Sequence, residues 1–267
     1  PLRQTPVVHE CDVCIIGGSC TGVFAAVRAA QLGASVALVE NNGMFGGVAT
    51  AGMVSIWHSL RDTSGERPII AGLTAEVIDR LHRRGAAVLH QHNPSTYATL
   101  NTAELAVELD DRVRENPRIR PYLHTRFVAT AGQAGQVTAA IIESKSGRQA
   151  IRAAVFVDAS GDGDLLARSG LPTRTLADLQ PATTCALIAG LDKVAAANPG
   201  FDLGKTVHNR ALPQALAKGF LWSAPVTGCP GLTMVAGTRV SGANCSIAAE
   251  LTDAEMEGRR QARAIRD

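Results

Sequence analysis

The stretch "CDVCIIGGSCTGVFAAVRAAQLGASVALVE", residues Cys11 to Glu40, decides the fold. It is apolar from Val13 to Ile16, which is typical of a parallel strand covered on both faces. Gly17 then permits a tight turn. The segment from Thr21 to Leu32 is rich in small residues and is followed by Gly33, a usual residue just after a helix. "ASVALVE" supplies a second strand, so the sequence predicts a strand, a turn, a helix and a strand in succession.

The turn "GGSCTG" has the spacing of a dinucleotide-binding turn, with Ser19 where the middle glycine usually stands. Its backbone N–H groups and the positive end of the helix can face a pyrophosphate, and the small Ser19 side chain adds a hydroxyl donor. The residues that we expect to make this contact are Gly17, Gly18, Ser19, Cys20, Thr21 and Gly22. Glu40 follows Gly17 by 23 residues, close to the roughly 20 at which an acid binds the ribose hydroxyls. Its carboxylate would repel a 2′-phosphate, which disfavours NADP, whereas the spacing alone allows NAD or FAD.

Composition and charge exclude several classes of partner. Hydrophobic residues make up 46% of the 267 residues, enough for a substantial core in one or two domains. Net charge is +2, with basic and acidic residues interspersed, so we expect no nucleic-acid partner. Apolar stretches stop well short of the roughly 20 residues of a membrane span. The first residues lack the pattern of an export signal. We therefore expect a soluble, cytoplasmic protein with no membrane partner.

The six cysteines are expected to be reduced thiols. Cys11 and Cys14 have C-x-x-C spacing, but on an extended strand they point to opposite faces about 10 Å apart, too far for a shared metal or a disulfide. Cys20 lies at a predicted helix N-terminus, which can lower its pKa and make it reactive toward alkylating agents. We expect no metal, because no His/Cys cluster has zinc or iron–sulfur spacing. Residues 41–60 contain no cysteine, which disfavours a disulfide reductase.

Two further stretches carry a family resemblance. "VE", followed by "GMFGGVATAG", and the later "VFVDASGDGDLLARSG" resemble the FAD-dependent oxidoreductases of the glutathione-reductase-like flavoproteins. The resemblance extends to "SIWHSL", "IIAGLTAEVIDRL" and "QPATTCALIAGLD", and so covers nearly the whole chain. It implies that Gly46 and Gly47 run along the flavin pyrophosphate and ribityl chain, and that "DASGD" returns to the first turn. Gly161 and Gly163 also suit a place where backbone meets a ligand.

The cofactor that the resemblance implies is FAD. It also implies that Phe127 falls where the backbone of such proteins touches the adenine ring. The residues expected to bind the cofactor beyond the first turn are Glu40, Asn41, Asn42, Gly46, Gly47, Thr50, Phe127, Ala159, Ser160, Gly161 and Asp162.

The fold class expected is α/β: a Rossmann-like parallel sheet forming an FAD-binding domain with a β-meander, plus a partial α+β substrate domain. Residues 71–84 and 102–115 are predicted helices, and residues 122–157 are a predicted antiparallel meander feeding a buried strand. The domain boundaries that we expect are 1–50 and 96–170 for the FAD-binding domain, and 51–95 and 171–267 for the partial substrate or cap domain.

The activity implied is hydride transfer between a small polar metabolite and the flavin. His58 is the expected base, and Arg239 is expected to clamp a carboxylate through its planar guanidinium. Members of the resembling family continue beyond the last residue here, so we expect a C-terminal segment or a second chain to complete the flavin site. Two alternatives stay open: a nucleotide-binding part that is inactive without that segment, and an NAD-binding or thiazole-synthase-like protein.

Overall fold

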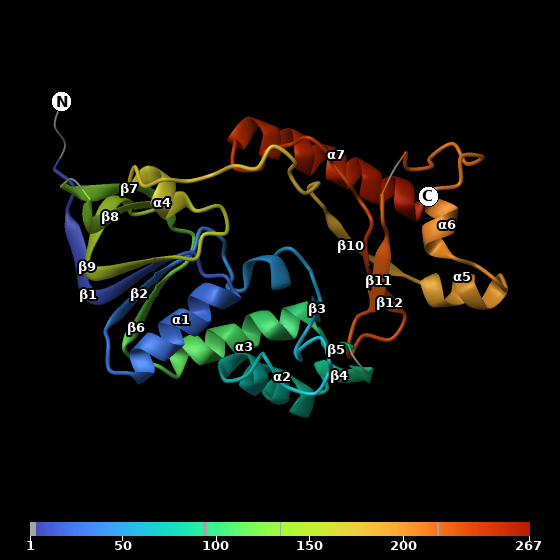
Figure 1. The fold of residues 1–267 in the computed structure, drawn as a ribbon, viewed down its shortest axis with the longest axis horizontal. Helices are drawn as coiled ribbons and strands as arrows, with labels where there is room; N and C mark the ends of the chain where they lie inside the picture. The colour runs from blue at the N-terminus through green and yellow to red at the C-terminus, as the bar shows by residue number, and fades with distance from the viewer. Residues whose placement is uncertain (1–3, 93–94, 134, 218) are drawn as a thin grey trace. The chain divides into compact units, whose positions relative to one another are not determined.

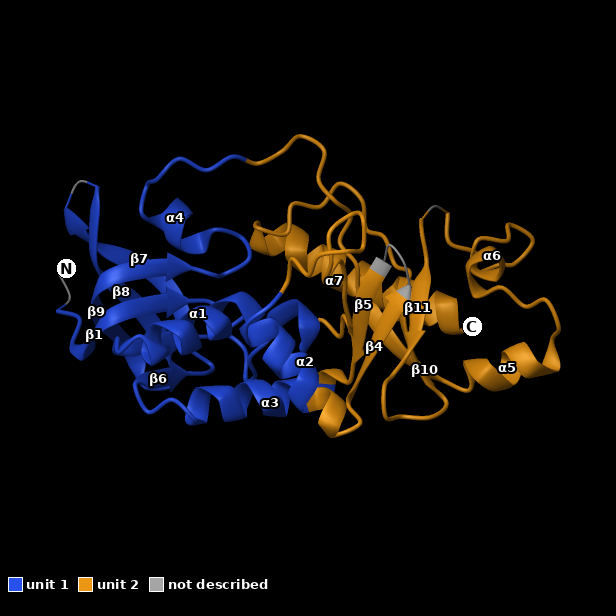
Figure 2. Cartoon of the chain, turned by 60° about the horizontal axis from the view of Figure 1, so that its bottom comes forward, with its two compact units in different colours: residues 1–51, 71–80, 103–174 blue, residues 52–70, 81–102, 175–267 orange. Residues whose placement is uncertain are grey.

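The computed structural model describes residues 4–92, 95–133, 135–217 and 219–267. These residues form two compact units, coloured separately in Figure 2. Unit 1 consists of residues 1–51, 71–80 and 103–174, and unit 2 of residues 52–70, 81–102 and 175–267.

Unit 1 is built on a six-stranded sheet in the order β6-β2-β1-β9-β8-β7 (Figure 1). β1 pairs in parallel with both β2 and β9, and β2 pairs in parallel with β6, as the strand–helix–strand pattern predicts. The strands of unit 1 are β1 (Val7–Ile16), β2 (Val36–Val39), β6 (Ile119–Tyr122), β7 (Arg126–Gln133), β8 (Gln136–Ser144) and β9 (Gly147–Asp158). The helices are α1 (Cys20–Gln31), the short 3-10 helix η1 (Gly47–Ala49), α3 (Thr102–Arg114) and α4 (Asp164–Arg168), with α2 (Leu73–Arg83) beginning in this unit.

The antiparallel meander consists of β7, β8 and β9. It begins at Arg126, four residues later than the sequence predicts. The reason is that Tyr122 ends β6, where it pairs in parallel with Val39 of β2. β9 then continues from the meander into the middle of the sheet, where Phe156 pairs with Cys14 of β1. One long strand therefore joins the antiparallel and parallel parts.

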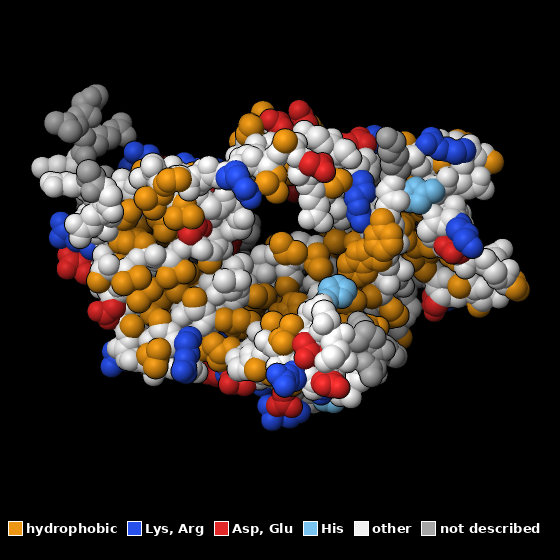
Figure 3. Space-filling model, viewed as in Figure 1, with side chains coloured by type: hydrophobic (Ala, Val, Ile, Leu, Met, Phe, Trp, Pro, Cys, Tyr) orange, Lys and Arg blue, Asp and Glu red, His pale blue; other side chains and the backbone are white. Residues whose placement is uncertain are grey.

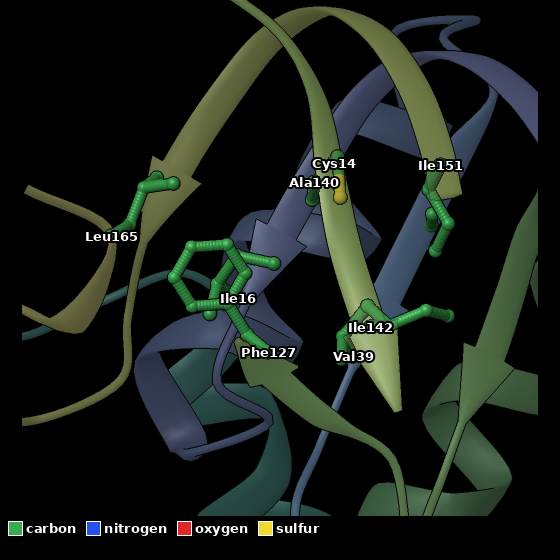
Figure 4. Close-up of a cluster of buried hydrophobic side chains, with 9 residues drawn as sticks. Cys14, Ile16, Val39, Phe127, Ala140, Ile142, Ile151 and Leu165 are labelled. Atoms are coloured by element: carbon green, nitrogen blue, oxygen red, sulfur yellow. The ribbon is translucent and has the colours of Figure 1, made fainter. Parts of the chain in front are cut away.

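The core of unit 1 lies on both faces of this sheet. On one face, Cys14, Ile16 and Val39 pack with Phe127 and other meander side chains (Figure 4). On the other face, α1 contacts β1, β2 and β6, and the buried residues of α1 recur at helical spacing, among them Val23 and Val27. Gly33 follows α1 with a φ of 97°, the conformation expected of a glycine after a helix.

Helices α2 and α3 are joined by ion pairs. The Glu108 side chain on α3 is fully buried and its Oε1 lies 2.7 Å from Nε of Arg80 on α2. Arg80 also donates two hydrogen bonds to the Glu115 carboxylate, at 2.9 and 2.6 Å. These carboxylates raise the pKa of Arg80.

The structure confirms the two helices predicted at 71–84 and 102–115, with their ends displaced by no more than two residues.

Unit 2 holds two three-stranded antiparallel sheets, β3-β5-β4 and β10-β12-β11. The strands are β3 (Ile56–Trp57), β4 (Ala87–His92), β5 (Ser95–Leu100), β10 (Cys185–Ala189), β11 (Trp222–Pro225) and β12 (Leu232–Ala236). The helices are α5 (Leu191–Ala197), α6 (Leu203–Val207) and α7 (Ala248–Arg266). Met234 and Val235 of β12 are buried in two separate hydrophobic clusters, which makes β12 the core strand of its sheet.

The surface is mixed in charge. On the face drawn in Figure 3, basic and acidic side chains are interspersed, and hydrophobic side chains are visible over the sheet of unit 1. Within the described residues, no helix is both long enough and apolar enough to cross a membrane.

Candidate cofactor-binding site

The turn after β1 admits only glycine at two positions. Gly17 has a φ of 99°, and a Cβ there would lie 2.2 Å from the carbonyl oxygen of Ala159. A Cβ on Gly22 would lie 1.9 Å from the carbonyl oxygen of Gly17. Both obstacles are backbone atoms, so neither can move without shifting a strand or the turn. The first and third glycines of the predicted turn are therefore required by the packing of β1, α1 and β9.

Ser19 is the N-cap of α1. Its Oγ accepts the backbone N–H of Gly22 at 3.3 Å and donates to the carbonyl oxygen of Ala159 at 3.2 Å. The hydroxyl carries one proton, so this proton goes to the strand end rather than toward a phosphate. The sequence predicted an additional phosphate donor here, whereas the observed role of the side chain is to fasten the turn to β9.

Glu40 sits at the end of β2 and is only 6% exposed. Its Oε2 accepts the N–H of Gly18 and its Oε1 accepts the N–H of Asn42, each at 2.7 Å. These two bonds fix the carboxylate between the glycine turn and the loop that follows β2. A carboxylate has about four acceptor sites, so acceptor capacity is left for a hydroxyl pair. Asn41 and Asn42 are exposed beside it.

The second glycine pair is brought against the first turn. The N–H of Gly46 donates to the carbonyl oxygen of Gly18 at 2.8 Å, and Gly46 also forms an isolated parallel bridge with Ser19. Gly46 and Gly47 have φ values of 106° and 54°. Thr50 is buried, and its hydroxyl donates to the carbonyl oxygen of Phe45 at 2.6 Å, so this side chain closes the loop internally.

The end of β9 returns to the same place. The N–H of Ala159 donates to the carbonyl oxygen of Ile16 at 2.7 Å. Ser160 is held by Asp158, whose Oδ1 accepts both its N–H at 3.1 Å and its hydroxyl at 2.7 Å. Gly161 has a φ of 93° with nothing within 4 Å of an added Cβ, so it lines open space. Partial burial and the nearby Asp164 raise the pKa of Asp162.

The prediction that the helix N-terminus lowers the pKa of the Cys20 thiol was wrong. Burial raises the pKa of its thiol to about 11, and this effect outweighs the helix N-terminus. The thiol contacts the carbonyl oxygen of Gly46 at 3.6 Å. Thr21, one residue on, is exposed on the first turn of α1.

Phe127 is 6% exposed and belongs to the hydrophobic core of the sheet (Figure 4). Its aromatic ring is therefore packed inside unit 1, and its backbone pairs with Ile142 of β8.

Two residues at this site escaped the sequence analysis. Asp158 orients the strand end, and its signal was an acid two residues before a serine, a usual pattern for a side chain that caps its own turn. His124 has a φ of 49°, and its N–H donates to the carbonyl oxygen of Asn42 at 3.0 Å. A Cβ on Gly43 would lie 2.6 Å from the His124 ring. Only the tertiary structure brings His124 beside Asn42 and Gly43.

The two predicted catalytic residues belong to unit 2. His58 is exposed, with its ring centroid 6.3 Å from that of Tyr97. The Nη1 of Arg239 donates to the Thr183 hydroxyl at 3.0 Å and to the carbonyl oxygen of Thr238 at 2.6 Å. Arg239 also lines a cavity of about 490 Å³. In the described part of the chain, no group of three or more His, Cys, Asp or Glu residues is arranged to hold a metal ion.

The residues of unit 1 fit the ADP half of a dinucleotide. Gly17 and Gly22 of the turn after β1 are packed against backbone, a helix begins there, and a buried carboxylate follows the next strand. These features lie at the carboxyl ends of parallel strands, the usual ligand site of such sheets. The fold and site therefore define a dinucleotide-binding α/β protein.

Comparison with known proteins identifies the family. The family model described as "FAD dependent oxidoreductase" matches residues 12–267, so the chain belongs to that family. Its members are enzymes that use FAD. No curated protein matches the sequence.

Solved structures agree on the fold. The geranylgeranyl bacteriochlorophyll reductase-like protein of Thermoplasma acidophilum superimposes with a TM-score of 0.56 and 16% identity, over 93% of this chain and 61% of that one. Glycine oxidase of Geobacillus kaustophilus gives a TM-score of 0.51 and 14% identity, over 95% of this chain and 78% of that one. The flavin-dependent monooxygenase PieE, solved with FAD and substrate, gives a TM-score of 0.51 and 18% identity, over 96% of this chain and 47% of that one. The chain thus spans about three fifths of the length of the first of these.

Proposed function

We propose that the protein transfers a hydride between a small polar metabolite and FAD held by unit 1. Family membership supports the cofactor. The observation that carries the proposal is the glycine turn, where a Cβ at Gly17 or Gly22 would collide with backbone. This packing brings the N-terminus of α1 close to the ends of β1 and β9, and backbone N–H groups at a helix N-terminus are a usual binding site for a pyrophosphate.

The residues of unit 1 have binding roles in this proposal. Bound FAD supplies the acceptor or donor of the hydride. The first turn of α1 directs backbone N–H groups and the positive end of the helix at the pyrophosphate. Glu40, held by Gly18 and Asn42, accepts hydrogen bonds from the ribose hydroxyls. Asp158 and Ser160 hold the neighbouring strand end in place.

His58 and Arg239 have substrate roles in this proposal. His58 takes the proton from a substrate alcohol or amine, and its exposed ring beside Tyr97 supports that role. Arg239 binds a substrate carboxylate. Its two bonds, to Thr183 and to the carbonyl oxygen of Thr238, orient the guanidinium along a cavity.

The partners proposed are a small-molecule substrate and a C-terminal segment or second chain that completes the flavin site, with neither nucleic acid nor membrane. A second candidate function is a nucleotide-binding part that needs this segment for activity. Its support is that the chain spans 61% of the length of the reductase-like protein. The proposed location is cytoplasmic, as the reduced-thiol interpretation of the six cysteines suggests.

Anaerobic reduction tests the proposal. Protein loaded with FAD is mixed with a panel of small alcohols, amines and hydroxy acids, and the visible flavin band is followed. We expect one substrate class to bleach the band, with slower bleaching when the transferred hydrogen is deuterium. Failure of every polar substrate to reduce the bound flavin would contradict hydride transfer. Bleaching that appears only after a C-terminal segment is added would favour the second candidate.

Variants then test the two residues. His58→Gln should lower kcat by about 10²-fold or more, the usual contribution of a general base. Arg239→Lys should raise KM for carboxylate substrates, because lysine lacks the planar fork. The control is Arg263→Lys, which changes an exposed arginine of α7 and should leave KM unchanged. Equal effects of the two lysine variants would exclude a specific role for Arg239.

A further inference from the structure

One face of the β3-β5-β4 sheet in unit 2 lines a cavity. Thr99 of β5 pairs with Ile56 of β3 and with Val88 of β4, and Tyr97 of β5 pairs with His90 of β4. Directly opposed residues of antiparallel strands project from the same face. These five side chains therefore form one continuous wall, and all five line the cavity.

Residues 223–231, the end of β11 and the turn into β12, form the opposite wall. The Asn101 amide holds this turn, donating to the carbonyl oxygen of Thr227 at 3.1 Å and contacting Sγ of Cys229 at 3.6 Å. The N–H of Cys229 also donates to the carbonyl oxygen of Val226 at 3.0 Å. The volume between the two walls, which is open to solvent on one side, is about 540 Å³, within the range of roughly 300 to 1,000 Å³ usual for small-molecule sites.

A chain of polar groups crosses the cavity. The His90 ring stacks on Tyr97, with centroids 4.6 Å apart and planes inclined by 13°. Nε2 of His90 lies 3.0 Å from Oγ1 of Thr99, and the Thr227 hydroxyl donates to the same oxygen at 3.2 Å. Because Thr227 gives its one proton to Thr99, its own oxygen keeps lone pairs for a donor from a ligand.

The described lining residues include no Lys, Arg, Asp or Glu. A charged ligand would therefore lose its hydration without gaining an opposite charge, which is costly. An aromatic ring, in contrast, fits beside stacked rings and aliphatic side chains. The lining thus favours a neutral molecule with a flat apolar body and one hydrogen-bond donor.

We propose that this cavity is a binding site for an uncharged aromatic alcohol or phenol. Its hydroxyl donates to Thr227, and its ring lies against the wall formed by His90, Tyr97 and the aliphatic side chains. The site belongs to unit 2 alone, so binding requires neither FAD nor hydride transfer.

Three probes with one ring system test the proposal by isothermal titration calorimetry on the full chain. 2-Naphthol is neutral and carries a donor, 2-methoxynaphthalene is neutral without a donor, and 2-naphthoate is an anion at neutral pH. We expect 2-naphthol to bind with one site and to shift the ring-proton resonance of His90. The methoxy compound should bind about fivefold more weakly, the value of one hydrogen bond, and the anion more weakly still. Tightest binding by 2-naphthoate, or no binding by any probe, would overturn the proposal.

A variant pair locates the hydrogen bond. Thr227→Val should weaken 2-naphthol about fivefold and leave 2-methoxynaphthalene unchanged, which also shows that the variant is folded. Thr96→Val is the matched control: Thr96 is a buried threonine of β5 that is not part of the lining. An equal loss of 2-naphthol affinity in both variants, or no loss in Thr227→Val, would overturn the assignment. If Thr227→Val fails to fold, the ranking of the three probes on the unaltered chain decides.

Discussion

Replacing Gly17 by alanine should destabilise the protein far more than the same change at Gly33. The two glycines have nearly equal φ values, 99° and 97°, so an alanine pays the same left-handed strain of about 1–2 kcal/mol at either position. At Gly33 nothing lies within 4 Å of the new Cβ. At Gly17 the Cβ would lie 2.2 Å from the carbonyl oxygen of Ala159, so the end of β9 must retreat by roughly 1 Å. Such overpacking typically adds about 1–3 kcal/mol.

We therefore expect a loss of about 2–5 kcal/mol in the free energy of unfolding for Gly17→Ala and of about 1–2 kcal/mol for Gly33→Ala. Urea denaturation followed by far-ultraviolet circular dichroism measures both values. Tryptophan fluorescence is unsuitable, because Trp57 and Trp222 both belong to unit 2. FAD affinity should fall in Gly17→Ala and stay unchanged in Gly33→Ala. Equal destabilisation of the two variants would refute the claim that β9 closes over the turn.

Three further results are expected. Ser19→Ala should cost about 1 kcal/mol of stability and Ser19→Gly only a few tenths, with FAD affinity kept in both, because backbone N–H groups bind the phosphate. Since burial raises the pKa of Cys20 to about 11, alkylation of its thiol should be slow near neutral pH, become faster as the pH rises, and be slower in native protein than in urea. Mass spectrometry of the labelled peptide measures these rates. Fast alkylation of the native protein at neutral pH would contradict the burial of the thiol. Glu108→Ala removes a fully buried carboxylate but leaves Arg80 paired with Glu115, so it should cost about 1–3 kcal/mol. Arg114→Ala, at an exposed pair, should cost less than about 1 kcal/mol in the same urea experiment.

The dinucleotide-binding half of the fold could be predicted because its signals are local. The apolar run before Gly17, the small residues of α1 and the position of Glu40 lie within one strand–helix–strand unit, where spacing along the chain translates directly into geometry. The family resemblance added the second glycine pair. In the structure, the hydrogen bond from the N–H of Gly46 to the carbonyl oxygen of Gly18 holds this second glycine pair against the first turn.

The rest depends on contacts between distant segments. The sequence did not reveal that the Ser19 hydroxyl is used by Ala159, since the two residues are 140 positions apart. The same holds for the thiol of Cys20, whose burial depends on segments that fold against the turn. Tyr122 shows a third limit: alternation along a strand does not tell whether its neighbour runs parallel or antiparallel. The cavity beside Thr99 and Thr227 joins residues 128 positions apart and has no sequence motif.

The measurement that tests the central claim most directly is a competition titration of FAD binding, followed by flavin fluorescence. If the glycine turn and Glu40 hold the ADP half of the cofactor, ADP should displace FAD. FMN lacks the ADP half and should therefore not bind in place of FAD. Glu40→Gln should weaken FAD and ADP by the same factor, because the glutamine oxygen can accept only one of the two N–H groups while its NH2 group faces the other and cannot accept it. Binding of FMN as tight as that of FAD, with no competition from ADP, would contradict the account.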